Sequence, residues 1–384
     1  MQRLAIFLVL ITTAFAPAAF AQGASDPAPP PLTLELPNRF ELQPVARLQV
    51  FGVALDLDDP DRNDPIVTGD PDLREGFSIR RARLGFRLNY AKMLGVSIIG
   101  GWNNRYDALS VRPDDPELVE ALITVSPFKQ LNVDLGYGKV AFGRQALTSS
   151  ADLLMWERSM MSELMAPERE PGLTIYGKAG PVGSAVLPED AFKYGVTISN
   201  GGGDWTGDLD PTPRVAGRAQ LDLLSSWENK ASNFAMPKFG LSVGGSIFYN
   251  WGLEANTLQA GGDLGIRFWR VTIQGEATFA QAVPTFDTET VPEVLARRRS
   301  FGWYAQFGVM VVPNLLEIAA RVDGYDDNLA LKDAGNRMDV AGGVNIFLLD
   351  TRLKLQLDYV HRFEMVATHA TNNDTLVLAV QARL

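Results

Sequence analysis

Apolar residues alternate with polar or small residues from Phe40 to the end of the chain, in segments of about ten residues. Clusters of Gly, Pro, Asn and Asp separate these segments. The pattern predicts an all-β fold, and an even strand number is what a single-chain transmembrane antiparallel β-barrel requires. We predict sixteen strands, at residues 40–57, 76–90, 94–105, 117–127, 131–140, 170–179, 191–200, 214–224, 238–250, 256–268, 270–282, 299–311, 314–325, 337–348, 350–362 and 373–384.

The connections between the predicted strands alternate in length. Those after even-numbered strands are mostly tight, as at 91–93 and 312–313, whereas those after odd-numbered strands are long, as at 58–75. Short turns at one end and long loops at the other are typical of outer-membrane barrels. Two connections on the short side, 180–190 and 225–237, are longer than this rule expects.

The predicted strand at 350–362 has one apolar and one charged face. Leu353, Leu355 and Leu357 lie on the first face, and Lys354 and Asp358 lie on the second. An unpaired buried charge costs several kcal/mol, so a charged inner face of this length favours a water-filled interior.

The N-terminal residues predict export, followed by a linker and then the barrel. Arg3 precedes an apolar run that closes on Ala19, Phe20 and Ala21, which is typical of a cleaved secretion signal at residues 1–21. Five prolines between residues 22 and 38 predict an extended N-terminal linker. Residues 39–384 are then expected to form the barrel.

Composition excludes several classes of function. The chain has no cysteine, which excludes disulfides and cysteine-ligated metals, and a net charge of −10 argues against a nucleic-acid partner. Only His361 and His369 could serve a catalytic triad, so we expect no enzyme, no cofactor and no metal site. Seven aspartates between Asp56 and Asp72 could bind calcium, but they lack the ordered calcium motif, and a solvated acidic loop accounts for them as well.

Two blocks of sequence resemble a known family. The first is Gly76–Arg87 (GFSIRRARLGFR), and the second runs from Gly136 to Arg144 (GYGKVAFGR) and on through Leu147–Ser150 and Met155–Ser159. Both are similar to the phosphate-selective porin O and P family. The resemblance implies a sixteen-stranded, usually homotrimeric barrel in the bacterial outer membrane, in contact with lipids and lipopolysaccharide, that passes small anions by passive diffusion. A barrel enzyme and a soluble periplasmic all-β binding protein remain the alternatives.

The longest connection, 141–169, is expected to fold inward as a constriction loop. Its centre, 150–165, has helical spacing with Ser149 or Ser150 as the N-cap. An external lid is the alternative. The loop residues singled out are Ser150, Asp152, Trp156, Glu157 and Arg158.

Arginines on one face of the second strand are the first candidates for binding anions, because guanidinium groups fork onto phosphate and carboxylate oxygens. These are Arg81, Arg83 and Arg87. Pairing with lumen acids is the alternative role, and the acids considered are Asp134, Glu276, Glu317 and Asp358. Further cations are expected on the pore wall, namely Arg144, Arg218, Arg267, Arg321 and Lys354.

Overall fold

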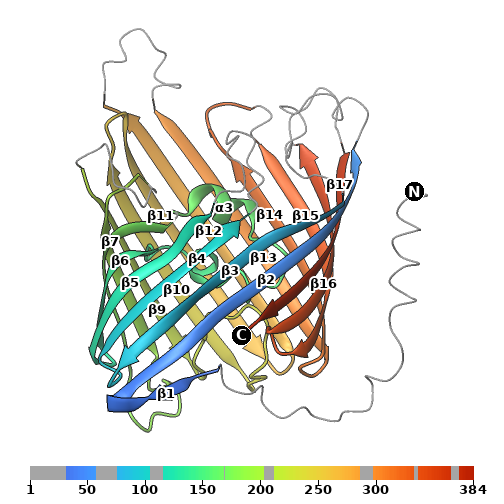
Figure 1. Ribbon diagram of the computed structural model, residues 1–384. Helices are drawn as coiled ribbons and strands as arrows, with labels where there is room; N and C mark the ends of the chain where they lie inside the picture. Colours follow the sequence, from blue (N-terminus) through green and yellow to red (C-terminus); the bar gives the residue numbers. More distant parts are fainter. Residues whose placement is uncertain are drawn as a thin grey trace.

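The computed structural model describes residues 32–57, 76–103, 116–167, 169–202, 212–285, 297–332, 336–364 and 372–384. Within these ranges, sixteen long strands form one antiparallel sheet (Figure 1). They are β2 (Phe40–Leu57), β3 (Gly76–Tyr90), β4 (Leu94–Asn103), β5 (Glu117–Phe128), β6 (Leu131–Lys139), β7 (Arg169–Ala179), β8 (Phe192–Ser199), β9 (Arg214–Leu223), β10 (Gly240–Trp251), β11 (Ala255–Phe268), β12 (Val271–Pro284), β13 (Arg298–Val312), β14 (Leu316–Asp326), β15 (Arg337–Leu349), β16 (Leu353–Glu364) and β17 (Asn372–Arg383).

The sheet closes on itself because β2 pairs with both β3 and β17. Every other strand pairs with its neighbours in sequence, so the backbone hydrogen bonds run around the whole barrel. A closed ladder leaves no unpaired edge, which is the condition for strands to cross a membrane. The predicted fold class is confirmed, and each predicted strand matches an observed one to within three residues.

The last part of the segment predicted as an extended linker, residues 22–38, pairs with the barrel instead. Residues Leu34–Leu36 form a short strand, β1, which pairs with the first residues of β2. The stretch after Pro31 contains no proline until Pro37, so its backbone can donate to a ladder. The predicted secretion signal lies outside the described residues, as does the acidic segment 58–75.

The outer face of the barrel is apolar. Phe77 and Leu84 are 75% and 69% exposed, and Trp102, Trp251 and Trp269 lie exposed toward the strand ends. Such a surface suits contact with lipid between two interfacial belts of aromatic residues. Among the described residues, no helix is long and apolar enough to cross a membrane.

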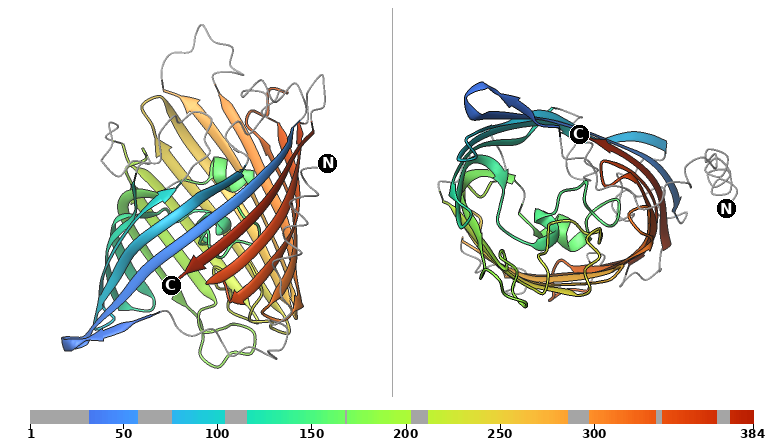
Figure 2. Two further views of the ribbon diagram at one scale, coloured as in Figure 1. Left: turned by 45° about the vertical axis from the view of Figure 1, so that its right-hand side comes forward. Right: turned by 90° about the horizontal axis from the view of Figure 1, so that it is seen from below.

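The constriction loop lies inside the barrel between β6 and β7, and its described residues before β7 are 140–167 (Figure 2, right). It contains two short helices, α2 (Arg144–Leu147) and α3 (Met160–Met165), instead of one helix over 150–165. The predicted N-cap was also wrong, because Ser159 caps α3 by accepting from the Ser162 N–H at 3.3 Å. The segment between the helices is not helical because its backbone groups bond to side chains of the wall.

Candidate pore constriction

The underside of the constriction loop packs on the inner wall. Leu154 and Met155 are 1% and 0% exposed, and Met161 and Met165 pack on Ala280 and Tyr304. Each such buried side chain contributes about 2 kcal/mol relative to an exposed one. Gly302 on β13 makes the contact possible, since a Cβ there would lie 2.7 Å from side-chain atoms of Met161 and Met165.

Polar side chains of the wall hold the loop through its backbone. The Asp358 carboxylate accepts from the Trp156 N–H at 2.7 Å, and Asp323 accepts from the Met160 N–H at 2.7 Å. Lys354 donates to the Leu153 carbonyl at 3.1 Å. The expectation of water along the charged face of the strand at 350–362 is therefore wrong at these positions, because loop backbone replaces the solvent.

Five cations predicted to line the pore are covered in the same way. Lys354 is 1% exposed, and the others are ion-paired or stacked: Arg144 and Arg218 bind Asp263 at 2.6 and 2.5 Å, Arg321 binds Asp323 at 3.0 Å, and Arg267 lies over the Trp227 ring. The four on strands, Arg218, Arg267, Arg321 and Lys354, face inward as the alternation predicts, and Arg144 belongs to α2 of the constriction loop. All five are buried, so they do not line the open passage.

The acids proposed as partners of the β3 arginines bind other groups. Glu276 accepts from the backbone N–H groups of Arg144 and Gln145 at 3.0 and 3.1 Å. Glu317 accepts from Ser232 at 2.7 Å, and Asp134 accepts from Thr124 at 2.7 Å. Across the described lumen, these acids therefore fasten loops and strands, and Arg87 pairs with Glu120 instead, at 3.4 Å.

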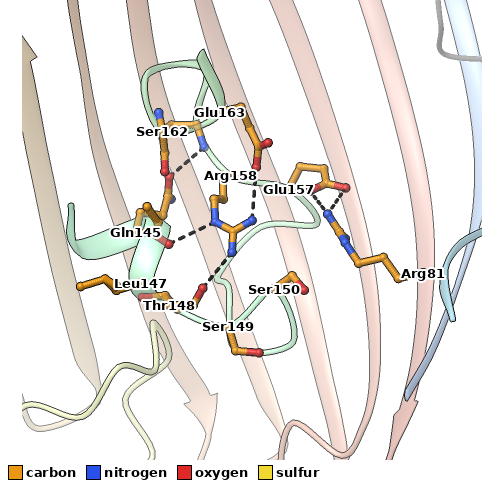
Figure 3. A network of polar contacts seen from close by, with 12 residues as sticks. Arg81, Gln145, Leu147, Thr148, Ser149, Ser150, Glu157, Arg158, Ser162 and Glu163 are labelled. Carbon is orange, nitrogen blue, oxygen red and sulfur yellow. Dashed lines mark hydrogen bonds and ion pairs between the residues drawn. The ribbon is translucent and has the colours of Figure 1, made fainter. Parts of the chain in front are cut away.

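Two consecutive arginines on β3, Arg80 and Arg81, form ion pairs with Glu157 at the tip of the loop, and we name these three residues the latch. A β-bulge at Arg80 brings both Arg80 and Arg81 to the Glu157 carboxylate, each at 2.6 Å. Figure 3 shows the contact between Arg81 and Glu157. Burial by itself would raise the pKa of Glu157, but the charges of Arg80 and Arg81 outweigh it and lower that pKa to about 2. Arg81 is 4% exposed, so it serves this latch.

The other loop residues singled out from the sequence also contact the wall. Ser150 accepts from Arg47 at 2.8 Å, and Asp152 pairs with Arg383 at 2.7 Å. The Trp156 ring packs edge-on against Phe51, with centroids 5.5 Å apart. These contacts fix the loop against β2 and β17.

Cationic side chains gather on the part of the lumen that the loop leaves open. We name Arg47, Arg83, Lys139, Arg158 and Arg169 the cationic patch. Each is partly exposed, and all five are close enough to interact electrostatically. Lys139 and Arg158 also fix the end of α2, where they donate to the Thr148 carbonyl at 3.0 and 2.8 Å. Figure 3 shows the Arg158 contact.

The strand register sets like charges directly opposite each other in the patch. Arg47 on β2 is the cross-strand partner of Arg83 on β3, and Lys139 on β6 is the partner of Arg169 on β7. Like charges in direct opposition destabilise a sheet. Sheet stability therefore does not explain these pairs. One member of each, Arg47 and Lys139, binds the constriction loop, and an anion between the two side chains of a pair would relieve the repulsion that remains.

Sequence reasoning missed Arg47, Lys139 and Arg169. The alternation along β2 could have identified Arg47, because it lies two positions from Gln49 and so on the same face of the strand. That face points into the lumen, where the Gln49 amide donates to Gln381 at 2.6 Å. Lys139 and Arg169 flank the constriction loop, 30 positions apart in sequence, and only the pairing of β6 with β7 sets them side by side.

Comparison with known proteins agrees with this geometry. The family model of phosphate-selective porin O and P matches residues 53–193, which include the constriction loop. The resemblance to that family is confirmed. A comparison with curated protein sequences gives no match.

Solved porins share the fold. The anion-selective porin from Comamonas acidovorans has a TM-score of 0.58 and 13% identity, over 90% of this chain and 100% of that one. OmpF of Salmonella typhi, in complex with daunomycin, has a TM-score of 0.58 and 10% identity, over 92% and 100%. The channel DcaP of Acinetobacter baumannii has a TM-score of 0.56 and 12% identity, over 91% and 99%.

Family and fold together indicate a porin of the bacterial outer membrane and suggest a channel rather than an enzyme. Of the two histidines, His361 pairs with Asp374 at 2.6 Å and packs edge-on against Phe363. His369 lies outside the described residues. The Arg-rich Gly76–Arg87 block, singled out from the sequence, supplies the latch and one member of the cationic patch.

Proposed function

We propose that this protein is a passive diffusion porin that prefers small anions, and that the cationic patch sets the preference. The observation that carries the proposal is the opposition of Arg47 to Arg83 and of Lys139 to Arg169 beside the constriction loop. Fixed positive charge in a narrow passage with low-dielectric walls concentrates anions there. Guanidinium groups bind phosphate and carboxylate oxygens in a forked geometry, which favours such anions as solutes.

The net charge of −10 does not oppose this preference. Permeation depends on the charges at the narrowest point, because charges more than a Debye length away are screened. Near the patch, Glu157 is neutralised by Arg80 and Arg81, and Glu120 is paired with Arg87. Glu117 also lies close enough to attract Arg83 and Arg169, but the five cations of the patch outnumber it, so the local balance is positive.

We also propose a homotrimer embedded among lipids and lipopolysaccharide. The apolar outer face supports contact with lipid or with another subunit. One solved structure of similar fold, OmpT of Vibrio cholerae, with a TM-score of 0.54 and 8% identity, is titled as a trimer form.

The test is the reversal potential of single channels in a salt gradient. We expect the parent to prefer chloride, and we expect R83Q/R169Q to shift toward cation preference, most strongly at about 0.01 M salt, where the Debye length is ~30 Å. Neither residue belongs to the Glu157 latch, so the loop stays in place. R270Q removes the same kind of charge at a turn between β11 and β12 and serves as the control.

A parent channel that prefers cations would overturn the anion preference. So would an R83Q/R169Q channel with the parent's reversal potential at low salt, since the patch would then have no part in selectivity.

A further inference from the structure

A second segment enters the lumen from the opposite end of the barrel. Residues 224–239 connect β9 to β10 at the end of the barrel where, apart from the β7–β8 connection, the connections are short turns, and we name them the support loop. Trp227, Ala231, Ser232 and Asn233 in it are each no more than 3% exposed. Seen from below, the yellow-green chain of this region lies inside the ring of strands beside the green constriction loop (Figure 2).

The wall anchors the support loop firmly. The Asn233 amide donates to the carbonyls of Trp269 and Val271 at 3.0 and 2.9 Å, which ties it to the turn between β11 and β12. Phe234 packs edge-on against Phe347 on β15, with centroids 4.8 Å apart. A connection with these anchors is a fixed part of the lumen.

The support loop contacts the constriction loop directly. The Ala231 N–H donates to the Asp152 carbonyl at 2.9 Å. The Ala231 side chain joins the buried cluster of Leu154 and Met155. The two loops, which come from opposite ends of the barrel, therefore meet inside it and share one packed core.

Trp227 makes the second contact through two cations. Its ring lies 3.9 Å from the Arg267 guanidinium carbon and 4.9 Å from that of Arg144, which belongs to α2 of the constriction loop. Cation–π contacts are strongest when desolvated, and Trp227 is 2% exposed. Gly265 leaves the room for this ring, because a Cβ there would lie 2.7 Å from it.

We propose that the support loop holds the constriction loop against the wall, with Trp227 as the positioning residue, so that the width of the passage stays constant under voltage. This inference rests on the proposed channel function. Around α2, the Glu276 carboxylate holds the backbone N–H groups of Arg144 and Gln145, and the Arg144 guanidinium lies between Asp263 on one side and Trp227 on the other. Removing the ring frees one side of that guanidinium.

The experiment is single-channel recording of W227A, W227F and E228Q under stepped voltage. We expect W227A to raise the closed fraction at a given voltage about tenfold, the population change that loss of one or two buried cation–π contacts produces. W227F keeps an aromatic face and should restore most of the parent's behaviour. Glu228 lies in the same loop with a side chain 74% exposed, so E228Q should match the parent.

Each outcome separates this inference from the function beneath it. A parent that forms no channel overturns the porin function, whereas W227A channels with the parent's closure and noise overturn the support role alone. If W227A fails to migrate as a folded barrel, G265A keeps the tryptophan and displaces its ring, and it should show the same increase in closure. Parent-like closure in G265A would overturn the proposal.

Discussion

At the scale of single residues, the position of a charge along a strand does not fix its role. Arg81 and Arg83 lie two positions apart on the same face of β3. Arg81 is buried against Glu157, and Arg83 faces Arg47 in the cationic patch. The difference arises from the constriction loop, whose tip covers Arg81 and leaves Arg83 partly exposed.

The latch at Glu157 predicts a pH response. Because its pKa in the folded protein is lowered from 4.5 to about 2, the ion pairs stabilise the loop fully above pH 4.5 and lose that contribution only as the pH falls toward 2. Loss of the latch should therefore add current noise near pH 2 and none between pH 7 and 4, which is measured as the difference between the parent and E157Q at each pH. E157Q, which cannot ionise, should be noisy at pH 7.

The control for the latch is E163Q, because Glu163 pairs only with Arg158 at 3.3 Å and its side chain is 47% exposed. Noise in E163Q equal to that in E157Q would mean that any change of loop charge disturbs the current, and the latch would lose its special role.

At the scale of elements, the constriction loop forms less helix than its sequence predicts, because its backbone groups bond to polar side chains of the wall. Between α2 and α3, backbone groups of Leu153, Leu154 and Trp156 bond to side chains on β15 and β16. A helix would use the same groups internally and leave the wall side chains buried without partners, which costs about 1–3 kcal/mol each.

Deleting residues 150–165 should therefore widen the passage and hydrate the wall beneath. We expect the unitary conductance to rise severalfold, because the loop narrows the lumen and its removal exposes Asp358, Lys354 and Asp323 to water. Deletion of 182–185, an exposed stretch of the β7–β8 connection, is the control and should leave conductance unchanged. An unaltered conductance without 150–165 would show that the loop does not limit the current.

At the scale of the whole molecule, closure of the sheet replaces a packed apolar core as the source of stability. The hydrogen bonds continue from β2 around to β17, and no cysteine contributes a disulfide. Apolar residues face outward, so lipid or another subunit takes the place of the core.

This architecture predicts a heat-modifiable protein. In unboiled detergent samples the barrel should migrate as a compact oligomer, because the closed ladder resists detergent until it is heated. Gel electrophoresis with and without boiling, together with circular dichroism, checks this. A monomer-sized band in the unboiled sample would contradict the homotrimer, and a mainly helical spectrum would contradict the barrel.

The sequence by itself determined the strands, their order and the inward or outward direction of their side chains except at bulges such as Arg80, because the period of two along a strand is a local property. It also located the constriction loop by its length and by the Gly136–Ser159 motifs. Register errors were excluded by the apolar face, which a slip of one residue would turn inward.

Only the tertiary structure decided which inward charges meet water. Asp358 is covered by Trp156, 202 positions away in the chain, and Trp227 reaches Arg144 from the opposite end of the barrel. Arg47 meets Arg83, and Lys139 meets Arg169, through strand pairing across long connections. Such contacts depend on where loops fold back, and the alternation along a single strand carries no information about a segment that covers it from across the lumen.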